Sequence, residues 1–367
     1  KIYIMLNKRL IEIFLQLAKI NALSSNELPV AEYVMSFLSK LGFKPSRDNS
    51  QSITKSNTGN VICKIGDGGD FLLLSHMDTA RPTLEVVPKI LEDKIVSDGN
   101  TVLGVDNRAG IAVLLYSLEY AIENNLKLKN FTLSFTTCEE TTLAGSTNLT
   151  ISDDIKYAII FDSSHRPGTF INSACGAKSF NIIINGKPSH SGIAPEKGIN
   201  SITIAASAIS KLTWGRLDSD TTANIGLING GSAVNVIPEK VILDGEIRSF
   251  NMDKVEGISK QIKSAFEEEA NKLGGDVTYL DLWDFKPFTV NENEEVFTKV
   301  TEAISKVGLQ PKAVISLGGS DANSLNARGI PSLNLGIGAQ NPHGNDEFIY
   351  LDDLQKSFEI AIEIIKE

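Results

Sequence analysis

The stretch FLLLSHMD, residues 71–78, places four apolar residues directly before a serine, a histidine and, two positions further on, an aspartate. A short apolar run of this kind is typical of a buried strand, so His76 and Asp78 would lie where that strand ends. A histidine or an aspartate at a strand end is usually a solvated loop residue, but the pair is also a typical start of a metal site. Only further polar residues at other strand ends can decide between these interpretations.

The composition indicates a folded globular protein. The chain has 367 residues, of which 42% are hydrophobic and 22% charged, and this length favours two domains. The formal net charge of -10 disfavours a nucleic-acid partner, because binding to phosphates needs clustered lysine and arginine. The three cysteines are an odd number without a CxxC spacing, which favours reduced thiols and a cytoplasmic location.

The N-terminal segment KIYIML, residues 1–6, is apolar but is followed directly by Asn7, Lys8 and Arg9. No small-residue cleavage site follows a long apolar stretch, so we expect neither an export signal nor insertion into a membrane. Met5 is a candidate for the natural start of the protein.

Strand-like runs alternate with helical spacing along most of the chain, which indicates an α/β sheet. Two opening helices are predicted between residues 7 and 41. The predicted strands are residues 61–65, 71–74, 131–136, 158–161 and 330–335, with later helices at residues 109–123 and 351–366. Ligands gather at the carboxyl ends of the strands in such sheets, so we expect a site there.

The middle of the chain follows a different order of elements. The predicted sequence is a strand at 180–185, a helix at 200–212, strands at 222–228 and 241–249, a helix at 253–273 and a strand at 277–280. This βαββαβ order is the ferredoxin-like pattern. We therefore predict a mixed-sheet α/β domain at residues 1–173 and 286–367, interrupted by an α+β ferredoxin-like domain at residues 174–285.

Five further residues with ligand chemistry lie at strand ends or just before helices: Asp106, Glu139, Glu140, Asp162 and His343. Each has an ordinary interpretation when taken alone, such as a helix N-cap for Asp106. Two adjacent carboxylates, however, repel each other unless a cation or a shared proton separates their roles. Imidazole and carboxylate groups without cysteine are typical of a catalytic site for zinc, manganese or cobalt.

The chemistry of two metals would use these residues in different ways. Two divalent ions about 3.5–4 Å apart need a shared anionic ligand, and Asp106 is the candidate bridge. Of the adjacent pair Glu139 and Glu140, one would bind metal while the other accepts a proton from a metal-bound water.

With these residues in order, the chain resembles the M20 family of metallopeptidases from His76 to His343. The likeness is greatest to its peptidase T-like branch, through the segments SHMDT (75–79), DGNTVLG (98–104), TTANIG (221–226) and GEIRS (245–249). The resemblance implies one zinc held by His76, Asp106 and Asp162, and a second held by Asp106, Glu140 and His343. Co²⁺ or Mn²⁺ would be substitutes. It also implies that Glu139 is the general base and that Asp78 orients His76.

The resemblance further implies that the inserted domain is a lid that joins two subunits in a homodimer. His190, in the segment GKPSHSG, would reach the partner's active site and stabilise the oxyanion of the tetrahedral intermediate. Asn235 and Arg248 resemble the residues with which the family grips its substrate, and arginine can bind a carboxylate through two hydrogen bonds.

The implied activity is hydrolysis of the N-terminal peptide bond of short peptides, as in an aminopeptidase or tripeptidase. Asp162, where other members of the family carry a glutamate, is the feature that favours this side of the family. Two alternatives stay open: a deacylase of N-acyl amino acids on the same scaffold, and a metal-binding relative without turnover.

Overall fold

The computed structural model describes residues 8–367, so the expectations for residues 1–7, including a start at Met5, lie outside the described part. Within residues 8–367, no helix has both the length and the apolarity that crossing a membrane requires. The two opening helices are confirmed as α1, Lys8–Ala18, and α2, Leu28–Lys40.

The chain forms two compact units. The first unit runs to Ser173 and also contains Thr289–Ser316 and Ser320–Glu367, whereas the inserted unit comprises Ala174–Phe288 and Leu317–Gly319. The short return of Leu317–Gly319 was not anticipated from the sequence. Its cause is local, because Arg248 Nη1 donates to the Leu317 carbonyl at 3.0 Å within the inserted unit.

The first unit is built on a nine-stranded sheet with the order β1-β2-β6-β3-β7-β16-β8-β14, in which β15 pairs with β8. The strands are β1 Ser46–Arg47, β2 Val61–Ile65, β3 Phe71–His76, β6 Phe131–Thr136, β7 Tyr157–Ser163, β8 Thr169–Ala174, β14 Phe288–Thr289, β15 Lys312–Ser316 and β16 Ser332–Gly336. β3 runs parallel to β6 and β7, and β16 runs parallel to β7, whereas β2 pairs antiparallel with β6 and β8 antiparallel with β16. The predicted mixed sheet is therefore confirmed.

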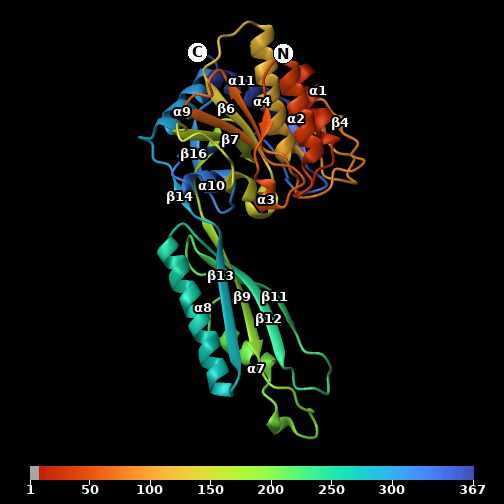
Figure 1. Ribbon diagram of the computed structural model, residues 1–367, viewed down its shortest axis with the longest axis vertical. Coiled ribbons are helices and arrows are strands. Elements are labelled where there is room, and N and C mark those ends of the chain that lie inside the picture. Colours follow the sequence, from red (N-terminus) through yellow and green to blue (C-terminus); the bar gives the residue numbers. More distant parts are fainter. Residues whose placement is uncertain (1–7) are drawn as a thin grey trace. The chain divides into compact units, whose positions relative to one another are not determined.

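The central strands lie deep in the first unit. All six residues of β3 and of β6 are buried, which is typical of parallel strands covered on both faces. Helix α4, Val105–Glu123, packs on β3 and β7, while α9, Glu295–Lys306, and α10, Asp321–Ala327, pack on β7 and β16 (Figure 1). Helices α1 and α11, Leu351–Ile365, pack against α4 in turn.

Several short elements complete the first unit. They are α3 Gln51–Thr54, α5 Glu139–Thr142, α6 Ala144–Thr147 and a three-stranded sheet of β17 Phe348–Tyr350, β5 Lys94–Val96 and β4 Lys89–Ile90. None of these elements, nor α9 or α10, was predicted from the sequence. In α9 the signal was present, since Val296, Val300 and Ile304 recur at helical spacing and are buried.

The inserted unit has a five-stranded antiparallel sheet with the order β10-β11-β12-β9-β13. Its elements are β9 Gly176–Asn185, the short helix η1 Pro195–Lys197, α7 Ser201–Ser210, β10 Gly215–Arg216, β11 Thr222–Gly230, β12 Lys240–Ser249, α8 Met252–Leu273 and β13 Asp276–Phe285. Burial alternates along β9, and both long helices pack on the sheet (Figure 1). The predicted ferredoxin-like α+β fold is confirmed, with β10 as an added short strand.

Helix α8 shows how closely the local sequence sets an element. At its start, the side chain of Asn251 accepts a hydrogen bond from the backbone N–H of Lys254 at 3.1 Å, as an N-cap does. At its end, Gly274 adopts a left-handed conformation with φ 82°, which is the usual way for a helix to stop. The helix predicted at residues 253–273 is confirmed, and α8 begins one residue earlier, at Met252.

A buried charge cluster joins α8 to the sheet of the inserted unit. The Lys178 ammonium, with only 7% of its side chain exposed, lies 2.8 Å from Glu256 and 2.7 Å from Asp281. Hydrogen bonds with Lys178 lower the pKa of Glu256, and they also lower the pKa of Asp281 by outweighing its burial.

We predict that Lys178→Met lowers the free energy of unfolding by about 1–2 kcal/mol near neutral pH, a value reduced for the partial exposure of the two carboxylates. Because both pKa values are lowered by folding, the stabilisation is complete above about pH 5, beyond the unfolded-state values, and is lost as the pH falls through the lowered values. Urea unfolding at neutral and acidic pH should show the difference between wild type and variant shrinking on acidification. An equal difference at both pH values would contradict this explanation.

Candidate metal centre

The first unit gathers all the predicted metal ligands at one edge of its sheet. His76 is the last residue of β3, Asp162 lies near the end of β7, and Glu139 and Glu140 open α5 directly after β6. His343 comes from the loop between β16 and β17. The strands β3 and β7 are longer than predicted, so His76 and Asp162 are strand residues and not the first residues of loops. Their backbones are thereby held in the sheet.

Three groups of three possible ligands form there, of which one is His76, Glu139 and Glu140 and the other two are triads that share Asp106. The ligand atoms of His76, Asp106 and Asp162 lie within 4.8 Å of one another, as do those of Asp106, Glu140 and His343. Asp106 Oδ1 is 2.9 Å from His76 Nε2, and Asp106 Oδ2 is 3.4 Å from His343 Nε2. The remaining carboxylates, of Asp162 and Glu140, each lie 3.1 Å from one of these histidines. The two oxygens of the Asp106 carboxylate thus lie near different histidines, as those of a bridging ligand do.

The backbone around Asp106 is unusual. Asp106 and Asn107 have non-helical dihedral angles at the start of α4, and the peptide bond between them is cis. Helix α4 is kinked at these two residues, so its regular part begins after Asn107, close to the predicted residue 109. The side chain of Asn107 caps this part, because its Oδ1 accepts a hydrogen bond from the backbone N–H of Gly110 at 3.1 Å, so the ordinary interpretation of Asp106 as the N-cap is wrong.

The cluster concentrates negative charge. Burial raises the pKa of Glu139 well above its ordinary value, and the nearby charges of Asp162 and Asp321 add to this. Burial also raises the pKa of Glu140. Burial alone would lower the pKa of His76, but Glu139 and Asp162 outweigh it and hold that pKa well above the usual value. The four carboxylates exceed what two imidazoles can balance, so the donor set fits divalent cations.

Asp78 lies behind His76 and is fully buried. Its Oδ1 is 3.3 Å from His76 Nδ1 and accepts a hydrogen bond from the backbone N–H of Glu139 at 3.1 Å. Its Oδ2 accepts from the backbone N–H of Glu140 at 3.1 Å and from the Ser24 hydroxyl at 2.6 Å. The backbone carbonyl of Asp78 is closer still to His76 Nδ1, at 3.1 Å, so the carbonyl and the side chain of this residue together hold a ligand imidazole and the start of α5.

Other buried polar residues at the centre were missed by the sequence analysis. The side-chain amides of Asn107 and Asn334 donate to the two oxygens of Asp162, at 3.0 and 3.2 Å. Glu27 accepts from the backbone N–H of Cys138 at 2.9 Å, where Cys138 adopts a left-handed φ of 54°. Asn334 carried a usable signal, since a polar residue within a buried apolar strand needs a partner. Glu27 carried none.

The other three predicted site residues belong to the inserted unit and do not lie together there. The segments of His190 and Asn235 are neighbours, because the Ser191 N–H donates to the Asn235 carbonyl at 3.0 Å. Arg248 lies near the opposite end of β12, at eight residues, or about 26 Å, from the first residue of that strand. Its guanidinium pairs with Glu246 through two hydrogen bonds of 3.0 Å.

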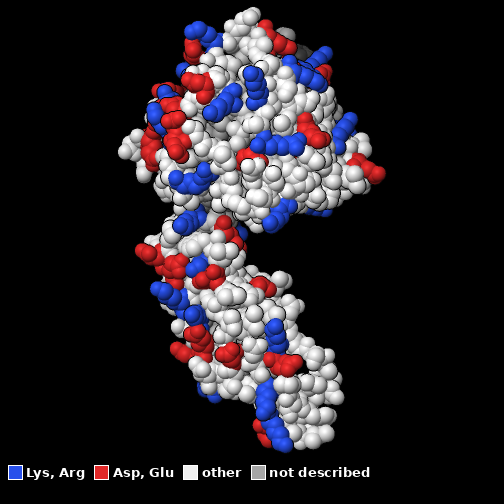
Figure 2. All heavy atoms as spheres, viewed as in Figure 1, with Lys and Arg blue, Asp and Glu red and all other residues white. Residues whose placement is uncertain are grey.

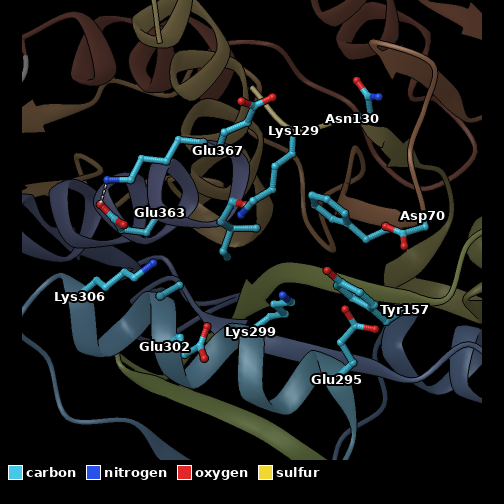
Figure 3. A pocket seen from close by; sticks show the side chains of 14 residues that line it. Asp70, Lys129, Asn130, Tyr157, Glu295, Lys299, Glu302, Lys306, Glu363 and Glu367 are labelled. Carbon is cyan, nitrogen blue, oxygen red and sulfur yellow. Dashed lines mark hydrogen bonds and ion pairs between the residues drawn. The ribbon is translucent and has the colours of Figure 1, made fainter. Parts of the chain in front are cut away.

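A hollow at the other edge of the first unit's sheet is separate from this centre (Figure 3). Among the residues that line it are Phe71 and Tyr157, the first residues of β3 and β7. Lysines such as Lys129 and Lys299 and several carboxylates line it as well. The ligands lie at the far ends of the same strands, about 17 Å away along β3. The hollow therefore contains none of the predicted ligands.

Comparison with known proteins gives a consistent result. Residues 172–273 match the peptidase dimerisation domain of the M20 family. The chain is 33% identical over 364 residues to the uncharacterised protein YqjE of Bacillus subtilis, covering 98% of both chains.

Two solved structures are similar over almost the whole chain. The aminopeptidase PepT from Bacillus cereus is 34% identical with a TM-score of 0.89, and 98% of each chain is covered. A tripeptidase from Staphylococcus aureus is 32% identical with a TM-score of 0.92, and the match covers 99% of this chain and 98% of the other. The chain therefore belongs to the M20 family of metal-dependent peptidases, in its peptidase T-like branch.

Proposed function

We propose that the protein is a dizinc aminopeptidase that hydrolyses the N-terminal peptide bond of short peptides. The observation that carries the proposal is the Asp106 carboxylate, whose two oxygens face two histidines in two separate triads. His76, Asp106 and Asp162 would hold one zinc, and Asp106, Glu140 and His343 the other. When bound, the metals would polarise the scissile carbonyl and lower the pKa of the attacking water.

Glu139 is our candidate for the general base. Its Oε2 lies 4.0 Å from His76 Nε2, with 9% of the side chain exposed, and it belongs not to the two triads that share Asp106 but to the third group, with His76 and Glu140. Burial raises its pKa, which suits a group that accepts a proton and then donates it to the leaving amine. Asp78 supports this role by fixing the backbone N–H of Glu139.

Glu139→Gln tests the proposed base. We expect the rate of peptide hydrolysis to fall about 10²- to 10⁴-fold, because the amide cannot accept the proton, while the metal content stays at the wild-type level. Glu140→Gln is the matched control and should lose metal, since Glu140 belongs to a triad. Metal analysis and a tripeptide assay on the same preparations give both readouts. Undiminished hydrolysis by a metal-loaded Glu139→Gln variant would rule out the proposed base.

The substrate class can be tested directly. We expect the wild-type enzyme to cleave a tripeptide with a free N-terminus faster than it cleaves an N-acetyl amino acid. The reverse preference would favour the alternative deacylase, which needs the same metal chemistry. Metal binding without hydrolysis of either compound, or of a peptide library, would favour a relative without turnover.

We further propose that two copies of the chain form a homodimer through the inserted unit. The match to a peptidase dimerisation domain supports this. On the face shown in Figure 2, one end of the inserted unit has a broad region without charged side chains, bordered on one side by charged residues. This unit also exposes large apolar side chains that the fold itself does not cover, among them Ile193, Leu227, Ile228 and Val234.

His190 would complete the partner's active site in such a dimer. Its Nδ1 accepts from the backbone N–H groups of Gly192 and Ile193, both at 3.2 Å, which places the proton of the neutral ring on Nε2. The side chain is exposed, so this N–H can donate to a developing oxyanion. Asn235, on the neighbouring segment, would bind the same substrate, and Arg248 would bind a substrate carboxylate.

Mixed dimers test this arrangement. His190→Ala and Glu139→Gln subunits should each form poorly active dimers, but a mixed dimer would hold one site with an intact Glu139 and an intact His190 from its partner. We therefore expect co-expression of the two variants to restore activity above that of either alone, measured on dimers purified with two different affinity tags. If His190 served its own subunit, each mixed site would carry one defect and no activity would return.

A further inference from the structure

Glu347 lies four residues after His343, and its side chain has no place in the chemistry proposed above. The residue is 1% exposed, and its carboxylate points to the start of α4. Oε2 accepts a hydrogen bond from the backbone N–H of Gly104 at 2.6 Å, and Oε1 accepts from the backbone N–H of Asp106 at 3.1 Å. The contact therefore reaches the backbone of the residue whose side chain is shared by both triads.

The same residue is tied to the segment of His343. The Glu347 N–H donates to the Gly344 carbonyl at 3.1 Å, which closes the turn that directly follows His343. That ligand has a left-handed φ of 66° and a side chain 49% exposed, so burial does little to hold it in place. Glu347 thus joins the loop of one ligand to the backbone of another, far away in the sequence.

Burying a carboxylate is costly unless hydrogen bonds or charges offset the loss of water. Here the donors are the backbone N–H groups of Gly104 and Asp106, which precede the regular part of α4. The guanidinium of Arg108, which is fully buried, adds an attractive charge from the same helix. A glutamate at this position is consequently satisfied only while α4 keeps this approach to the loop of residues 343–347.

We infer that Glu347 is a positioning residue that sets the spacing between Asp106 and His343, and thereby the affinity of the second metal. The inference rests on the proposed metal sites, since these two residues are ligands of the triad completed by Glu140. Glu347 makes no contact with the metal itself in this arrangement. Its effect would pass through the backbone of Asp106 and the turn after His343.

Zn²⁺ titration of metal-free protein, followed by calorimetry, tests the inference on the Glu347→Gln variant. Glutamine keeps the shape but offers one oxygen, so one of the two backbone N–H groups would face an amide NH₂. We expect the affinity for one of the two Zn²⁺ ions to fall about 10- to 100-fold, with a smaller change for the other. The visible spectrum of the Co²⁺-loaded variant, which reports ligand geometry, should also change.

Asp353→Asn is the matched control. Asp353 is a buried carboxylate of α11 that pairs with Arg166 at 2.8 Å, so its loss should lower the melting temperature. It contacts no described ligand segment through the hydrogen bonds of its carboxylate, so we expect both Zn²⁺ affinities and the Co²⁺ spectrum to match the wild type. This separates a general loss of stability from a specific loss of ligand position.

The inference is overturned if a folded Glu347→Gln variant binds both metals with wild-type affinity and gives the wild-type Co²⁺ spectrum. If that variant does not fold, Glu347→Asp carries the same test, because it keeps both oxygens but withdraws them by one methylene. A wild-type protein that binds a single Zn²⁺ would instead contradict the two-metal proposal, so the two failures are distinguishable.

Discussion

The interaction on which the active centre depends is the one between the Asp106 carboxylate and two histidines on opposite sides of it. A carboxylate can bind two cations only if each of its oxygens points to one of them, and a flexible side chain in a loop would not keep this orientation. Here the direction comes from backbone dihedral angles that depart from the helix at its first turn. The parallel strands β3 and β7 then bring His76 and Asp162 to one side, because parallel strands end at the same edge.

The carboxylates of the centre repel one another, so the segments that carry them must be held in place. Hydrogen bonds from the backbone N–H groups of these segments do this. Three buried carboxylates outside the two triads accept hydrogen bonds from ligand-bearing segments: Glu27 from Cys138, Asp78 from Glu139 and Glu140, and Glu347 from Gly104 and Asp106. Each bond satisfies a donor that the turn would otherwise leave buried and unpaired. Three buried carboxylates therefore hold the ligand-bearing segments in place, and the buried guanidinium of Arg108 offsets part of their negative charge.

The features of the metal centre that depend on short stretches of sequence could be predicted. Apolar runs that end in His76, Asp162 or the adjacent pair Glu139 and Glu140 indicated strands and ligands together. The strand ends were placed too early because pairing with a neighbouring strand extends them, as where His76 pairs with Thr136. The contacts of Glu27 and Glu347 could not be predicted, because each partner lies more than 100 residues away and no local pattern marks it.

Within the inserted unit, the residues proposed to bind the substrate lie far apart. A tripeptide spans about 10 Å when fully extended. His190 and Asn235 lie beyond the Lys240 end of β12 and Arg248 lies near its other end, and the strand between Lys240 and Arg248 alone spans about 26 Å. These residues of one chain therefore cannot all touch the same short peptide while the sheet is intact. If His190 and Arg248 both act on one substrate, they must come from different subunits, and dimerisation would then be a condition for catalysis.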